Sequence, residues 1–177
     1  LYLRKGVPYK PLLTGGGQED GRRAGTEAVP QIVALGKACE LATKRLENNG
    51  SEKLAQLRDL LEGRLFDTIE GIHRNGATEY RLPNTSHLSI DNVPAGDLLI
   101  LTGEKGLCIS SGSACSTGTR DPSRIMKAMG HSDERALSSI RLSVSSMNTG
   151  EEIIKAADII IAAVEKIRSL RPQTNGP

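Results

Sequence analysis

Cys115 lies in a run of small and polar residues that could serve nucleophilic chemistry. The ten residues from Ser110 to Thr119 include no large apolar side chain, so they cannot pack as core and predict a loop that solvent can reach. A thiolate in such a loop can swing onto a substrate, and the nearby Arg120 and Arg124 could lower the pKa of the thiol. The alternative is an incidental loop cysteine without a reactive role.

A glycine-rich segment from Gly15 to Thr26 holds the parts of an anion cradle. Its glycines free backbone amides, Arg22 and Arg23 add positive charge, and Thr26 adds a hydroxyl before a predicted helix. A glycine turn followed by a solvated arginine pair accounts for the same residues. The segment is not a Walker loop, because no Gly-Lys-Ser/Thr follows the glycines.

Arg141 lies in the alternating segment from Ser139 to Val144, on the face opposite Ile140 and Leu142. It either extends its guanidinium to solvent or offers it to a carboxylate, and the sequence leaves both possibilities open. His73, His87 and His131 show no ligand-like spacing. We expect them to be surface or hydrogen-bonded histidines.

The other two cysteines fall on apolar patterns, and we expect both to be buried. Cys39 lies on the apolar stripe of a predicted helix, and Cys108 lies between Leu107 and Ile109. Three cysteines without a CxxC pair argue against a disulfide framework and against a structural zinc site. A reducing compartment follows from this cysteine usage.

Apolar periodicity predicts the elements that must position these residues. Strands are expected at Leu1–Arg4, Ser86–Ile90, Leu107–Ser110 and Ser139–Val144. Helices are expected at Val29–Glu47, from a Ser51 cap through Ile69, at Gly96–Lys105, from Asp121-Pro122 to Gly130, and from a Thr149-x-x-Glu152 capping box to Arg171-Pro172. The pattern predicts a small α/β sandwich with helices on one side, and a domain boundary near Asn49.

Composition excludes two function classes. The 177 residues carry 23 Lys+Arg and 21 Asp+Glu, for a formal net charge of +2, and contain only one Phe, three Tyr and no Trp. The chain therefore lacks the basic footprint and the rings of a nucleic-acid binder. Its longest apolar run, Ile159 to Val164, is far too short to span a membrane.

Several motifs occur together in a specific order. They are Gly15-Gly16-Gly17-Gln18-Glu19 with Arg23-x-Gly25-Thr26-Glu27, then Ser110-Ser111-Gly112-Ser113-Ala114-Cys115, then Asp121-Pro122-Ser123 and Ser139-Ile140-Arg141-Leu142-Ser143. This combination resembles the cysteine desulfurases of the NifS/IscS type, enzymes of the class V aminotransferase group that depend on pyridoxal phosphate and have fold type I. The resemblance covers almost the whole chain.

The resemblance implies a role for each candidate residue. Cys115 matches the loop cysteine that takes sulfur from L-cysteine as a persulfide while alanine is released. Arg141 matches the arginine that pairs with the substrate carboxylate. Thr26 matches the threonine that reaches the cofactor phosphate of the neighbouring subunit in a homodimer, with Arg23 and Gly25 shaping the approach.

The resemblance also implies that this chain is the C-terminal part of such an enzyme. The lysine that binds pyridoxal phosphate is expected upstream of Leu1, so the chain alone is expected to be inactive. Residues 1–47 would end the large cofactor domain, residues 48–171 would form the small α/β domain with the cysteine loop, and residues 172–177 would be a polar tail.

The partners implied are the N-terminal portion of the same enzyme, a second subunit, and a sulfur acceptor or iron–sulfur scaffold protein. The expected location is cytoplasmic, or an organelle matrix if a targeting segment was removed. Two alternatives remain open: a lyase relative acting on selenocysteine or cysteine, and a non-catalytic module that binds acceptors or supports dimerisation.

Overall fold

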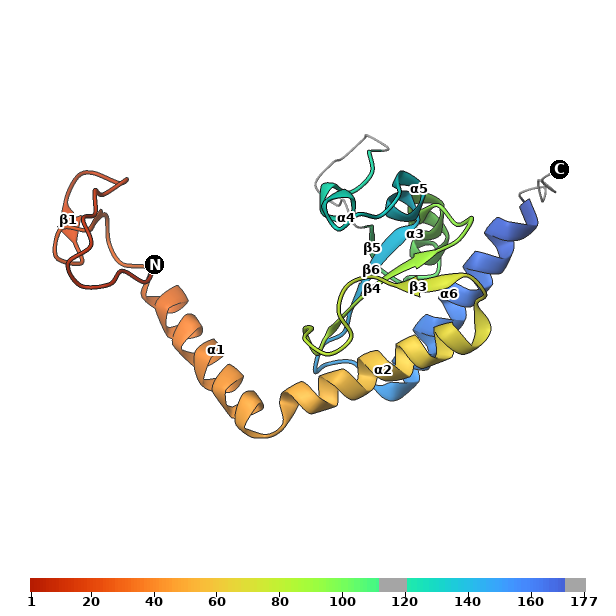
Figure 1. Cartoon of the computed structure of the whole chain (residues 1–177). Coiled ribbons are helices and arrows are strands. Elements are labelled where there is room, and N and C mark those ends of the chain that lie inside the picture. Colours follow the sequence, from red (N-terminus) through yellow and green to blue (C-terminus); the bar gives the residue numbers. More distant parts are fainter. Residues whose placement is uncertain (112–120, 171–177) are drawn as a thin grey trace. The chain divides into compact units, whose positions relative to one another are not determined.

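The computed structural model describes residues 1–111 and 121–170. The chain divides into two compact units, Leu1–Glu47 and Asn48–Pro177. The first unit contains the antiparallel pair β1 (Gly17–Gln18) and β2 (Arg23–Ala24), followed by the long helix α1 (Val29–Glu47) (Figure 1). The expected helix over these residues is confirmed, whereas the expected strand at Leu1–Arg4 is wrong because these residues pair with no described neighbour.

Helix α1 has the apolar periodicity of a packed helix but buries none of its residues. Its exposed apolar side chains are Val29, Ile32, Val33, Leu35, Leu41 and Leu46. Cys39 is exposed as well, so the expectation that it is buried is wrong for this chain. The physical reason is that no element of the first unit covers the apolar stripe of the helix.

The second unit is built on a four-stranded antiparallel sheet. The strands are β3 (Ile72–Arg74), β4 (Thr85–Ile90), β5 (Ser110–Ser111) and β6 (Ser139–Ser143), and their order in the sheet is β3-β4-β6-β5. The helices are α2 (Gly50–Thr68), α3 (Ala95–Gly103), α4 (Arg124–Ala128), α5 (Asp133–Leu137) and α6 (Gly150–Leu170). The predicted α/β fold class is confirmed.

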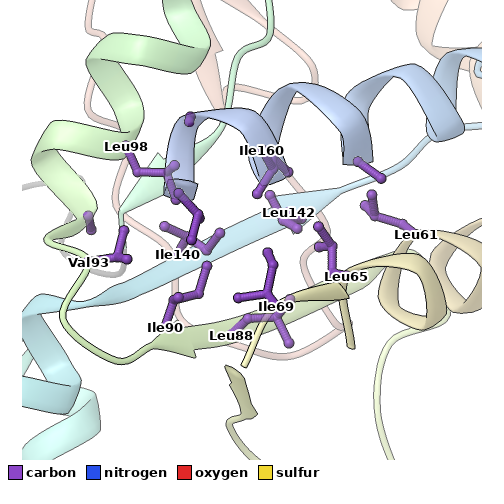
Figure 2. Close-up of a cluster of buried hydrophobic side chains, with 14 of the residues drawn as sticks. Leu61, Leu65, Ile69, Leu88, Ile90, Val93, Leu98, Ile140, Leu142 and Ile160 are labelled. Atoms are coloured by element: carbon purple, nitrogen blue, oxygen red, sulfur yellow. The ribbon is translucent and has the colours of Figure 1, made fainter. Parts of the chain in front are cut away.

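The core of this unit lies between one face of the sheet and helices α2, α3 and α6. Figure 2 shows Leu88 and Ile140 from the central strands meeting Leu65 of α2 and Ile160 of α6. These four side chains are at most 1% exposed, so the two-residue alternation of the strands and the helical stripes interlock as the sequence predicted.

The opposite face of the sheet is polar and is partly covered by α5. Ser89 of β4 is fully buried there, and its hydroxyl donates to the backbone carbonyl of Arg135 at 3.1 Å. His87 of β4 and Arg141 of β6 lie on the same face as a directly paired couple of residues. Among the described residues, no helix has both the length and the apolar character needed to cross a membrane.

Two of the expected helix caps differ from the structure. Helix α2 begins after Asn49, which has a left-handed backbone, and not at a Ser51 cap. Ser123, not Asp121, caps α4, because its hydroxyl accepts the Met126 amide. By contrast, the Thr149/Glu152 capping box is confirmed by reciprocal bonds of 3.0 and 3.2 Å.

The strand expected at Leu107–Ser110 is reduced to Ser110–Ser111. The Leu107 amide closes the C-terminus of α3 by donating to the Thr102 carbonyl at 3.0 Å, a bond typical of a Schellman motif. Cys108 follows directly and is exposed, so its expected burial in a strand is wrong.

Candidate functional site

Arg141 lies on the polar face of the sheet, between side chains from both neighbouring strands. The register places it directly opposite His87 of β4 and opposite Ser110 of β5. Its side chain is exposed, and its Nη2 donates to the Ser110 hydroxyl at 3.5 Å. Since no described carboxylate lies within ion-pair distance, the guanidinium is available to an anionic ligand.

His87 is held by a network of polar side chains from three segments. The Asn75 side-chain amide lies 3.1 Å from His87 Nδ1 and donates to the Ser89 hydroxyl at 2.8 Å. Arg135 of α5 donates from Nε to Asn75 Oδ1 at 3.0 Å. Asn75 is buried, so this network fixes the imidazole from one side.

The electrostatics around His87 favour a neutral ring. Burial lowers the pKa of His87, and the nearby Arg141 and His131 lower it further. The expectation of a hydrogen-bonded histidine is therefore correct. The sequence did not lead us to predict that His87 lies beside Arg141. The signal that could have revealed it is the alternation of the two strands, which places both residues on the polar face.

A buried ion cluster anchors the β3–β4 connection that carries Asn75. Glu62 of α2 is 2% exposed and contacts Arg74 and Arg81 at 2.7 Å each. Burial acts to raise the pKa of Glu62, but hydrogen bonds from the two arginines outweigh it and lower the pKa to about 2. The Arg74 carbonyl also accepts from Arg135 at 3.2 Å, which links this cluster to the His87 network.

In the first unit, the glycine-rich segment forms the hairpin of β1 and β2. The Gly25 amide donates to the Gly16 carbonyl at 3.1 Å, and Gly25 has a positive φ of 85°. The Arg23 side chain lies against this glycine, because a Cβ at Gly25 would be 3.9 Å from Arg23 Nη2. Thr26 follows with an exposed side chain.

The two arginines of this segment behave differently. Arg22 forms an exposed ion pair with Asp20 at 3.8 Å, whereas no described carboxylate lies within ion-pair distance of Arg23. A guanidinium without a counter-ion, next to a hydroxyl and a glycine backbone, is a donor set that fits a phosphate group. Arg23, Gly25 and Thr26 therefore form the candidate anion site of the first unit.

Cys115 lies outside the described residues, as does Arg120. Strand β5, which carries Ser110, immediately precedes the segment that contains this cysteine. Arg124 is described and is an exposed residue at the start of α4. Within the described residues, the structure places Arg141 beside Ser110 and His87.

Comparison with known proteins identifies the family of this chain. Residues 4–155 match the model of the aminotransferase class-V family. The match covers most of the chain, and the chain belongs to this family.

Its relatives within the family are cysteine desulfurases. The chain is 43% identical over 175 residues to the cysteine desulfurase IscS of Methanosarcina thermophila and 41% identical over 175 residues to a cysteine desulfurase of Trichormus azollae. These alignments cover 98% and 99% of this chain but only 43% and 44% of the two relatives. The chain thus spans less than half the length of the curated relatives it matches.

A solved structure shares the fold. It is described as a NifS-like protein, and it is 33% identical to this chain with a TM-score of 0.80. The superposition covers 93% of this chain and 41% of the other. The resemblance to the NifS/IscS type inferred from the motifs is therefore confirmed.

Proposed function

We propose that this chain is the C-terminal portion of a cysteine desulfurase that depends on pyridoxal phosphate. The observation that carries the proposal is the identity of about 40% to cysteine desulfurases along nearly the entire chain. The geometry around Arg141 supports it, since an exposed guanidinium without a described counter-ion suits the carboxylate of an amino-acid substrate.

In this proposal, Arg141 binds the α-carboxylate of L-cysteine and Cys115 is the nucleophile. The Cys115 thiolate attacks the substrate sulfur, the carbon–sulfur bond breaks, and its electron pair stays with carbon, which gains a proton. The products are alanine and a persulfide on Cys115, which together contain every atom of the thiol and the substrate. A sulfur acceptor or iron–sulfur scaffold protein then takes the terminal sulfur.

Pyridoxal phosphate, when bound, would supply the electron sink for this chemistry. Arg23, Gly25 and Thr26 would hold its phosphate, with Thr26 acting across a homodimer. Residues 1–47 are the end of the large cofactor domain in this proposal. The uncovered apolar residues of α1 support that placement, because such a stripe is normally packed against other elements.

Residues 48–171 are in turn the small domain that carries the cysteine loop, followed by the tail 172–177. The lysine that binds the cofactor would belong to the N-terminal portion of the enzyme. The isolated chain is therefore expected to be inactive, and the complete enzyme is expected in the cytoplasm or an organelle matrix.

The test combines this chain with the N-terminal portion of its enzyme, pyridoxal phosphate and dithiothreitol, which reduces the persulfide and releases its outer sulfur as sulfide. It measures the alanine and sulfide formed from L-cysteine. We expect release by the mixture and none by either part alone. Cys115→Ala should abolish sulfide release, whereas Cys108→Ala is the matched control because Cys108 is also an exposed thiol. Equal activity of the two variants would overturn the role of Cys115.

The same assay separates the alternatives. A selenocysteine or cysteine lyase that forms no persulfide would keep its activity in Cys115→Ala and would show it with selenocysteine as well. A non-catalytic module would release no alanine under any of these conditions and would bind an acceptor protein without the cofactor.

A further inference from the structure

The orientation of the buried Asn75 amide follows from the guanidinium beside it. Arg135 can only donate hydrogen bonds, so the Asn75 atom that lies 3.0 Å from Arg135 Nε must be the carbonyl oxygen. The amide nitrogen then faces the Ser89 hydroxyl at 2.8 Å and His87 Nδ1 at 3.1 Å. Because Asn75 is buried, its amide has little opportunity to form hydrogen bonds with water instead.

This orientation sets the tautomer of His87. An amide nitrogen only donates, so Nδ1 of His87 must accept, and a neutral ring then carries its proton on Nε2. The burial of the ring and the nearby Arg141 and His131 disfavour a second proton. Among the described residues, none forms a hydrogen bond with Nε2.

The protonated edge of this ring belongs to the same surface as Arg141. His87 and Arg141 are directly opposite residues on neighbouring antiparallel strands, and the Cβ atoms of such pairs lie about 4.5–5.5 Å apart. Asn75 engages His87 from the β3 side, while Arg141 lies on the β6 side. A carboxylate paired with Arg141 would therefore lie on the same face of the sheet as the imidazole of His87.

Building on the function proposed above, we propose that His87 is a second residue of the substrate-carboxylate site. Its Nε2–H donates a hydrogen bond to the carboxylate that pairs with Arg141. Asn75 and Arg135 are positioning residues that act through His87 by fixing its tautomer. A neutral donor in this place adds a directed hydrogen bond without adding another charge to be desolvated.

The tautomer is tested in the full chain by nitrogen NMR of labelled histidine. We expect the Nε2–H form for His87 at neutral pH. Asn75→Asp keeps the shape of the side chain but replaces the donor with an acceptor, so it should move the His87 proton to Nδ1. A wild-type ring protonated on Nδ1 would overturn the inference.

Carboxylate binding is tested in the same sample with L-alanine as the probe. We expect L-alanine to shift the His87 Nε2 resonance, and Arg141→Gln to abolish the shift. His73 is the matched control, because its Nε2 already contacts Asp91 at 2.9 Å. A shift of His73 equal to that of His87, or no shift of His87, would contradict the proposed contact.

In the reconstituted enzyme, His87→Ala should raise KM for L-cysteine about 10-fold with kcat changed less than about 2-fold, as expected for one hydrogen bond to a charged group. His87→Gln, whose amide reaches about the Nε2 position, should restore most of the affinity, and His73→Ala should leave KM unchanged. An unchanged KM in His87→Ala would overturn the inference.

Failure of the proposed function has a different signature. The wild-type mixture would then release no alanine, while the NMR measurements would still decide the role of His87.

Discussion

Helix α1 and helix α2 have the same length of 19 residues but differ in what surrounds them. Helix α2 buries Leu61 and Leu65 against the sheet of its own unit, whereas α1 buries nothing. Both sequences show helical apolar periodicity, so the pattern alone does not distinguish them. One unit of this chain therefore contains its own hydrophobic core, whereas the helix of the other unit exposes its apolar residues.

The largest expected effect of this difference appears when leucines of the two helices are truncated. Leu65→Ala removes a fully buried side chain and should lower the free energy of unfolding by about 3 kcal/mol. Leu46→Ala in α1 removes a side chain that is 70% exposed and should change it by less than about 0.5 kcal/mol. Urea unfolding of the chain measures both, and equal losses would contradict the difference between the two units.

Carboxylates of the two units provide the next comparison. Glu62→Gln removes the charge that neutralises two arginines and should cost about 3 kcal/mol at pH 7, as for other broken buried pairs. Glu40 of α1 also bridges two cations, Lys37 and Lys44, at 2.8 and 2.6 Å, but these pairs are exposed. Glu40→Gln should therefore leave the urea midpoint unchanged.

The Glu62 contribution should also depend on pH. Its pKa falls from 4.5 to about 2 in the folded chain, so folding favours the ionised form. The stabilisation is complete above the unfolded pKa and is lost as the pH falls toward 2. The stability difference between wild type and Glu62→Gln should therefore shrink between pH 5 and pH 2, and a constant difference would show that the charge is not its source.

A smaller effect is expected when glycines of the two units are replaced. Gly71 has a φ of 65°, and a Cβ there would lie 2.9 Å from the Asp91 carboxylate that contacts His73. Gly71→Ala should cost about 1–2 kcal/mol. Gly36 in α1 has open space around it, so Gly36→Ala should stabilise that helix by up to about 1 kcal/mol. Thermal unfolding followed by circular dichroism compares the two variants, and a loss of stability in both would contradict this.

Apolar periodicity predicted most of the fold, because the side chains that pack against one another recur along the sequence at strand or helix spacing. The alternation around Ile140 and the stripe of α6 needed only the rule that apolar residues face one another. The prediction of a strand at Leu107 failed because the Leu107 amide donates its hydrogen bond to the C-terminus of α3. The prediction that Cys39 is buried failed for another reason. The pattern shows that one face of the helix is apolar, but not whether this chain contains the element that packs against that face.

The candidate site was predictable in part. Arg141 on a polar face followed from alternation, and the motifs around Thr26 followed from the family resemblance. The Asn75–Arg135 contact joins residues 60 positions apart through a side-chain amide, and no local pattern encodes such a contact. The His87 network therefore required the structure.

The most direct test of the proposed function is to locate the sulfur atom taken from L-cysteine after a single turnover. The reconstituted enzyme is mixed with an amount of L-cysteine equal to its sites, and peptides containing each of the three cysteines are weighed by mass spectrometry under non-reducing conditions. We predict that one sulfur atom is added to Cys115, together with one alanine released per site. Sulfur bound at Cys39 or Cys108, or alanine released without any persulfide, would contradict the proposal.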